Sequence, residues 1–155
     1  FATGLRVSEL SNIKIKDIDF CEREIKIMGK GSKERFVFYN KECAKVLDSY
    51  LKECRSKLLN GKDSEYLFIN HLGDKLTDRG IRLIIDKIVK KSCIKSKVSP
   101  HTFRHTFATM LLNEGCNIKS VQELLGHSSL GTTGIYTHLT NDEVRLVYMK
   151  AHPRA

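Results

Sequence analysis

Apolar residues recur at helical spacing along most of this 155-residue chain, whereas residues 24–39 alternate apolar and polar side chains around a glycine-containing turn. The alternation places Ile25 and Ile27 before the turn and Phe36 and Phe38 after it. This pattern predicts one β-hairpin within a largely helical chain.

Helix start and stop signals divide the rest of the chain. Ser99 followed by Pro100 is a strong helix start, and Gly115 is a suitable stop, so residues 101–112 are predicted to be helical. The same reasoning predicts helices at 7–13, 40–54, 77–88, 117–126, 132–139 and 142–150, and a short strand at 64–70. The isoleucines of residues 81–88 are expected to face the core. The expected class is α+β, a mostly helical domain with a small antiparallel β-sheet.

The charge balance favours an acidic partner. Lys and Arg number 27 against 18 acidic residues, which gives a net charge of +9. A domain this basic attracts polyanions, so nucleic acid is the leading partner, with a merely solvated lysine-rich surface as the alternative. The length suits a single domain. The opening at Phe1 resembles the middle of an element, so we expect a fragment of a longer chain.

The cysteine pattern and the hydropathy indicate which cellular compartment to expect. The five cysteines are odd in number and contain no C-x-x-C pair, so neither a disulfide framework nor a zinc ribbon is indicated. No apolar run approaches the roughly 18 residues of a membrane span. We expect a cytoplasmic protein with no membrane partner.

The segment HTFRH carries the first candidate chemistry. His101 and Arg104 stand three apart on the predicted helix and share a face, while Phe103 and Phe107 turn toward the core. These polar residues are equally compatible with an ordinary surface. A zinc site formed by His101 and His105 with Cys116 or His127 is the weaker alternative, because Arg104 would repel the cation.

The sequence contains four separated motifs: ATGLRVSEL, GKGSKER, HTFRHTFAT and LLGHSSLGTTGIYTH. In this order they resemble the tyrosine recombinase, or phage integrase, family throughout its catalytic domain, and the closing HPRA resembles the end of Xer-type recombinases. The resemblance implies that residues 1–155 form the tyrosine recombinase catalytic fold, truncated at its N-terminus and lacking the family's DNA-clamping domain.

The same resemblance implies an active site. The matching positions are Arg6, Lys30, His101, Arg104, His127 and the nucleophile Tyr136. Glu9 matches a supporting acidic position, and we expect DNA contacts from Lys33, Arg35 and His105. No metal and no cofactor are expected.

The expected DNA-cleavage reaction explains why each of these residue types is needed. A phenol has a pKa near 10, so Tyr136 needs a base, and His101 is the candidate. Arg6 and Arg104 are expected to hold the phosphate oxygens with planar forks. The resemblance assigns protonation of the leaving 5′-oxygen to Lys30, with Lys33 as the nearby rival, and His127 is expected to donate a hydrogen bond to the phosphate.

These implications define the expected activity and partners. The chain is expected to cleave and rejoin double-stranded DNA through a 3′-phosphotyrosyl link, within a homo- or hetero-tetramer of protomers. Residues 141–155 are candidates for the contact between protomers, and packing on their own core is the alternative. A topoisomerase of similar chemistry and a catalytically idle DNA-binding relic are the rival functions. Gly131 and Gly134 further predict a loosely held helix around Tyr136.

Overall fold

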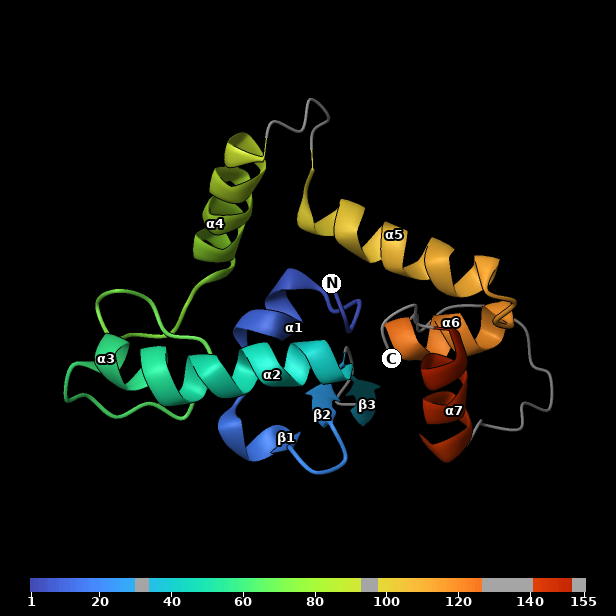
Figure 1. The fold of residues 1–155 in the computed structure, drawn as a ribbon, viewed down its shortest axis with the longest axis horizontal. Coiled ribbons are helices and arrows are strands. Elements are labelled where there is room, and N and C mark those ends of the chain that lie inside the picture. Colours follow the sequence, from blue (N-terminus) through green and yellow to red (C-terminus); the bar gives the residue numbers. More distant parts are fainter. Residues whose placement is uncertain (30–33, 93–97, 127–140, 152–155) are drawn as a thin grey trace.

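Helices dominate the computed structural model, which describes residues 1–29, 34–92, 98–126 and 141–151 (Figure 1). The α-helices are α1 (Val7–Ser11), α2 (Lys41–Ser49), α3 (Ser56–Leu59), α4 (Asp78–Lys91), α5 (Pro100–Asn113), α6 (Ile118–Leu125) and α7 (Asn141–Ala151). The short 3-10 helix η1 (Ile15–Asp17) precedes the sheet, and the π-helical segment η2 (Tyr50–Arg55) joins α2 to α3. The predicted α+β class is confirmed.

The predicted hairpin forms and belongs to a three-stranded antiparallel sheet. Its strands are β1 (Ile18–Asp19), β2 (Glu24–Met28) and β3 (Glu34–Phe38), in the order β1-β2-β3. Ile25 lies opposite Val37 in the register of β2 and β3. Both residues are buried, as the alternating pattern requires.

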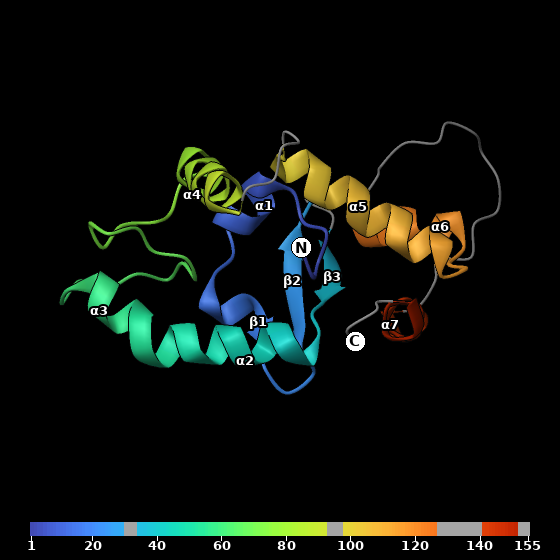
Figure 2. The same cartoon turned by 45° about the horizontal axis from the view of Figure 1, so that its top comes forward.

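The sheet separates two hydrophobic cores. Figure 2 shows α5, α6 and α7 together at one end of the fold, with α3 and α4 at the other. One core packs β1, β2 and part of β3 against α2, and its buried members are Ile13, Ile18, Ile25, Ile27, Val37, Tyr39, Leu47 and Leu67. The other packs β3 against α5, α6 and α7, and its buried members are Phe38, Phe107, Leu111, Val121, Leu124, Leu125, Val144, Tyr148 and Ala151. Adjacent residues of β3 are buried in opposite cores, so this strand connects the two halves of the fold.

Helix α7 packs on its own chain. Val144 and Tyr148 are buried, and the Tyr148 hydroxyl donates a hydrogen bond to the Ala2 carbonyl at 3.0 Å. Arg145 forms an ion pair with Glu22. Packing on the chain's own core was the alternative considered for residues 141–155, and these contacts agree with it. A contact between protomers stays a prediction.

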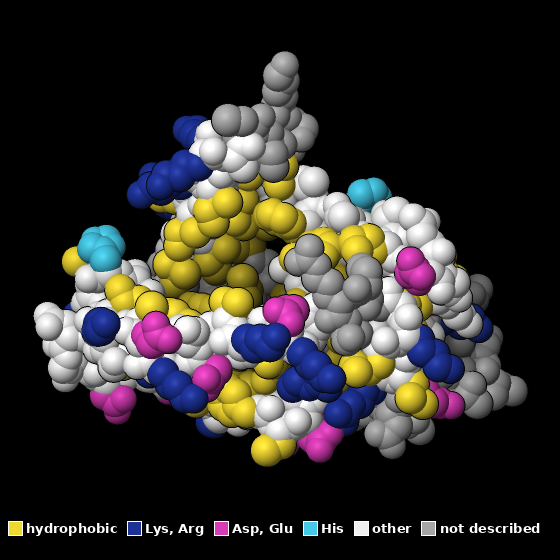
Figure 3. Space-filling view, viewed as in Figure 1, with side chains coloured by type: hydrophobic (Ala, Val, Ile, Leu, Met, Phe, Trp, Pro, Cys, Tyr) yellow, Lys and Arg dark blue, Asp and Glu magenta, His cyan; other side chains and the backbone are white. Residues whose placement is uncertain are grey.

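Two predicted elements differ from the structure. Residues 64–70 form isolated bridges rather than a strand, and the Arg55 side chain bonds three carbonyls of this segment. On α4, Ile81 is buried, but Ile84 and Ile88 are 48% and 60% exposed, so the predicted core face is wrong there. Apolar side chains gather over α4 and the hollow beside it (Figure 3). Phe103 is also wrong as a core residue, with 36% of its surface exposed.

Within the described ranges, no helix combines the length and apolar content that crossing a bilayer requires. The cysteines described there are all free thiols.

Candidate active site

Glu9 is the centre of a cluster of arginines. Arg6 precedes the first turn of α1, and its backbone N–H donates to Glu9 Oε2 at 2.8 Å. The Arg6 guanidinium donates to Glu9 Oε1 at 3.0 Å, and Arg35 Nη2 donates to Glu9 Oε2 at 2.9 Å. Arg104 Nη1 lies 3.9 Å from the same oxygen. One carboxylate therefore holds three like charges together, drawn from the residue before α1, from β3 and from α5.

The same arginines bind the end of α6. The carbonyls of residues 124–126 follow one another where this helix ends, and such carbonyls have no partner within a helix. They accept hydrogen bonds in order from Arg35 Nε at 3.2 Å, Arg104 Nη2 at 2.5 Å and Arg6 Nη2 at 3.1 Å. Arg104 also donates to the Gly4 carbonyl at 2.8 Å. The partial negative charge of a helix C-terminus suits these cations.

The cluster keeps an excess of positive charge. Three guanidinium groups face one carboxylate, which leaves a net charge of +2. Burial lowers the pKa of Arg104 to about 10, and the charge of Arg6 adds to this effect, but the group stays protonated at neutral pH. Burial alone would raise the pKa of Glu9, but the hydrogen bonds from Arg35 and Arg6 lower it below its usual value. Glu9 is therefore ionised.

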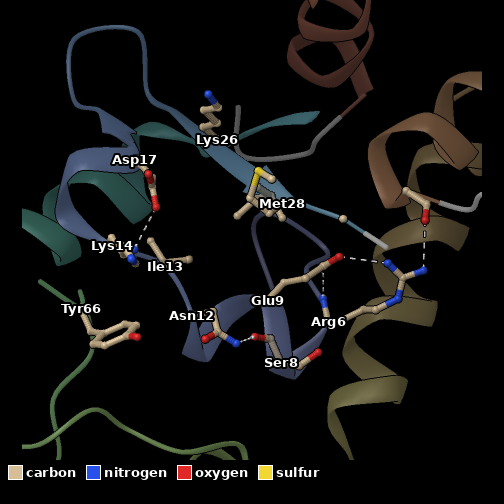
Figure 4. A pocket seen from close by; sticks show the side chains of 13 residues that line it. Arg6, Ser8, Glu9, Asn12, Ile13, Lys14, Asp17, Lys26, Met28 and Tyr66 are labelled. Atoms are coloured by element: carbon tan, nitrogen blue, oxygen red, sulfur yellow. Dashed lines mark hydrogen bonds and ion pairs between the residues drawn. The ribbon is translucent and has the colours of Figure 1, made fainter. Parts of the chain in front are cut away.

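Exposure differs among the cluster's members. The side chains of Glu9, Arg104 and Arg35 are 8%, 11% and 13% exposed, whereas that of Arg6 is 42% exposed. Figure 4 shows the Arg6 guanidinium beside Glu9 at the edge of an open cleft. Arg6 is thus the member most accessible to a ligand.

A cleft of about 220 Å³ brings Arg6 together with His101 and Arg104. Its lining also includes Arg82 and Asp78 from α4. Asp78 accepts a hydrogen bond from the Ser11 hydroxyl at 2.5 Å, which fixes α4 against α1. Arg82 was not among the predicted site residues, because no local motif indicates that α4 lies beside α1.

A larger cleft of about 750 Å³ is lined by both Arg6 and Glu9 (Figure 4). Lys14, Lys26 and Tyr66 line it, and so does Gly29, the residue before Lys30. Lys14 and Lys26 form ion pairs with Glu65 and Glu34, each at 2.8 Å. Arg6 therefore faces both clefts.

The remaining predicted residues divide into two groups. Lys30, Lys33, His127 and Tyr136, with Gly131 and Gly134, lie outside the described residues. His105 is exposed on α5 and lines neither cleft. Across the described part of the chain, no group of three or more His, Cys, Asp or Glu side chains is arranged to hold a metal ion.

Replacing Glu9 with glutamine should lower the free energy of unfolding at pH 7 by about 3 kcal/mol, because three arginines would lose the carboxylate between them. The folded-state pKa of Glu9 is lowered, so its stabilisation is present above the unfolded pKa and lost as pH falls through the folded value. The difference between wild type and Glu9→Gln should accordingly shrink below about pH 4.

Urea unfolding at pH 7 and at lower pH measures this difference. Glu34→Gln is the control, because Glu34 pairs with Lys26 while 49% exposed, and such surface pairs contribute less than about 1 kcal/mol. Equal destabilisation by the two variants would contradict the central position of Glu9.

Comparison with known proteins adds independent findings. A model of the phage integrase family matches residues 1–143. A tyrosine recombinase XerC of Oceanobacillus iheyensis is 52% identical over 157 residues, covering 100% of this chain and 52% of the relative. Another, from Staphylococcus epidermidis, is 48% identical over 155 residues with the same coverage. The chain spans about half the length of the curated relatives it matches.

Solved structures agree with the fold. The crystal structure of XerA recombinase matches with a TM-score of 0.76 and 40% identity, covering 99% of this chain and 56% of that one. XerH site-specific recombinase, in a pre-cleavage complex with its difH substrate, matches with a TM-score of 0.70 and 32% identity, covering 94% of this chain and 42% of that one.

Proposed function

The chain belongs to the phage integrase family, and from this premise we propose that it is the catalytic part of a site-specific tyrosine recombinase. The observation that carries the proposal is the shared cleft of Arg6, His101 and Arg104, backed by a cluster with a net charge of +2. Its substrate is double-stranded DNA, in keeping with the substrate-bound XerH structure and the chain's net charge of +9.

The reaction begins with the Tyr136 hydroxyl attacking a backbone phosphate. As the new P–O bond forms, the phenolic proton passes to His101, and Arg6 and Arg104 stabilise the charge on the non-bridging oxygens. His127 donates a further hydrogen bond to the phosphate. The bond to the 5′-oxygen breaks, and Lys30 supplies the proton that this oxygen requires.

Resealing runs the same steps in reverse. A 5′-hydroxyl of another strand gives its proton to Lys30 and attacks the phosphotyrosine, and Tyr136 leaves with a proton returned by His101. The covalent link conserves one phosphodiester bond throughout, so the exchange consumes no ATP. Two such exchanges within four protomers complete recombination, and the proposed compartment is the cytoplasm.

The test is covalent capture. The full-length protein is incubated with nicked candidate-site DNA in EDTA and without ATP, and the products are separated on a denaturing gel. A protein–DNA adduct that withstands denaturation is the expected result. DNA binding without any adduct would overturn the proposal in favour of an idle DNA-binding protein, and steady relaxation of supercoiled plasmid lacking the site would favour a topoisomerase.

Arg82 should contribute a phosphate contact next to the reacting one, because its side chain lines the same cleft as Arg6 and Arg104. Replacing it with glutamine is expected to weaken DNA binding and to reduce the slope of log Kd against log salt by about 0.9, the value for one lost contact. Fluorescence anisotropy over a range of salt concentrations measures both quantities.

The matched control is Arg79→Gln. Arg79 is an exposed arginine one turn earlier on α4 and lines neither cleft. If both variants change the slope equally, the phosphate contact is not specific to the cleft that Arg82 lines.

A further inference from the structure

Arg35 directs its side chain into the protein. The side chain is 13% exposed, its Nη2 donates to Glu9 at 2.9 Å, and its Nε donates to the Leu124 carbonyl at 3.2 Å. These contacts span α1, β3 and the end of α6. They suit a role within the site better than the DNA contact predicted from the sequence.

Gly126 leaves room for this arginine. Its backbone is left-handed, with φ at +65°, and a Cβ built on it would lie 2.8 Å from both Cζ and Nη1 of Arg35. Such distances are too short for real Cβ atoms, so a side chain at this position would displace the guanidinium. Arg35 and Gly126 therefore fit together closely.

We propose that Arg35 is a positioning residue that fixes the end of α6 and thereby sets the point from which the chain enters His127. This inference rests on the proposed function, in which His127 donates a hydrogen bond to the phosphate. Consecutive Cα atoms are about 3.8 Å apart, so a shift of Gly126 is passed directly to its neighbour. Arg6 and Arg104 hold the two carbonyls that follow Leu124, and Arg35 holds the helix behind them.

The proposal predicts a loss in rate and not in affinity. A displacement of about 1 Å in a group that acts on the reacting atoms costs on the order of 10²-fold in rate. Arg35→Gln should therefore slow formation of the covalent adduct by about 10²-fold at saturating DNA. The Kd for DNA should change less than about threefold, because Arg35 offers little surface to the ligand.

Arg55 offers a matched control. This arginine uses the same two nitrogens as Arg35, Nε and Nη2, but donates through both to backbone carbonyls, those of Leu67, Ser64 and Tyr66, and it lines neither cleft. Arg55→Gln removes similar bonds and should cost similar stability while leaving the adduct rate within about threefold of wild type. An equal slowing of the two variants would mean that Arg35 acts only through stability and would overturn the proposal.

A double-mutant cycle separates positioning from a merely structural role. If Arg35 acts through His127, adding Arg35→Gln to His127→Ala should slow the reaction little further, by less than about threefold. Additive losses would overturn the proposal. An adduct missing even from the wild-type protein would instead reject the proposed function, together with this inference.

A second variant changes the other partner of the Arg35–Gly126 contact. It keeps the proposal testable if Arg35→Gln fails to fold. Gly126→Ala should reproduce the loss in rate, because the new Cβ displaces Arg35. Gly115→Ala is its control, since Gly115 also has a positive φ of +83° but nothing lies within 4 Å of its built Cβ. Equal rates for the two alanine variants would overturn the proposal.

Discussion

Tyr136→Phe is expected to abolish the covalent DNA adduct while leaving DNA binding close to that of the wild-type protein. The substitution removes only the phenolic oxygen, which is the proposed nucleophile, and removing a nucleophile costs on the order of 10⁶-fold in rate. Such a loss lies below detection in a gel assay. Binding should persist, because the arginines and the rest of the basic surface are unchanged.

The chain contains five tyrosines, and their surroundings identify the control. Tyr39 and Tyr148 are buried, and burial raises the pKa of both phenols, so neither suits a nucleophile. The Tyr50 hydroxyl is occupied, donating to Leu67 O at 3.2 Å and accepting from Ile69 N at 3.1 Å. Tyr66 alone among the four described tyrosines lines a cleft together with Arg6.

Tyr66→Phe is accordingly the matched variant. It keeps the ring that lies below the ammonium of Lys75, 4.5 Å from its centre, and removes the same single oxygen as Tyr136→Phe. Adduct formation by Tyr66→Phe should stay within about threefold of wild type. An adduct that persists in Tyr136→Phe and vanishes in Tyr66→Phe would reassign the nucleophile.

Local signals predicted most helix boundaries, because the capping side chains act within one turn. Asn40, Thr77, Ser99 and Asn117 each begin a helix and accept a backbone N–H of its first turn in the structure. The strand predicted at residues 64–70 is wrong, and three carbonyls of this segment bond the side chain of Arg55 instead of another strand. Local patterns carry no information about such a partner.

The candidate site was predictable to a similar extent. Helical spacing placed His101 and Arg104 on one face, and only the family resemblance joined them to Arg6, nearly a hundred residues earlier. Neither approach identified Arg82 as a cleft residue or the inward contacts of Arg35. Both depend on how α4, β3 and α6 pack around α1, which is settled by tertiary contacts.

Arg104→Lys should slow adduct formation by about 10²- to 10³-fold at neutral pH, although it preserves a basic residue. The guanidinium reaches the carbonyls of Gly4 and Leu125 with two separate nitrogens, at 2.8 and 2.5 Å, and a single ammonium lacks this fork. A lysine has one nitrogen in place of the two that make these contacts, so it cannot keep this geometry and the phosphate would be poorly held.

The loss should also depend on pH in a defined direction. Burial and the nearby Arg6 lower the pKa of Arg104 to about 10, so the wild-type group stays charged between pH 7 and pH 9. A lysine starts about two units less basic, and the same surroundings would bring its pKa close to the working pH, where it loses its charge as pH rises. The ratio of wild-type to variant rate, measured in single-turnover reactions, should therefore grow from pH 7 to pH 9. A ratio that stays constant or falls would show that buried charge at position 104 is not what the reaction requires.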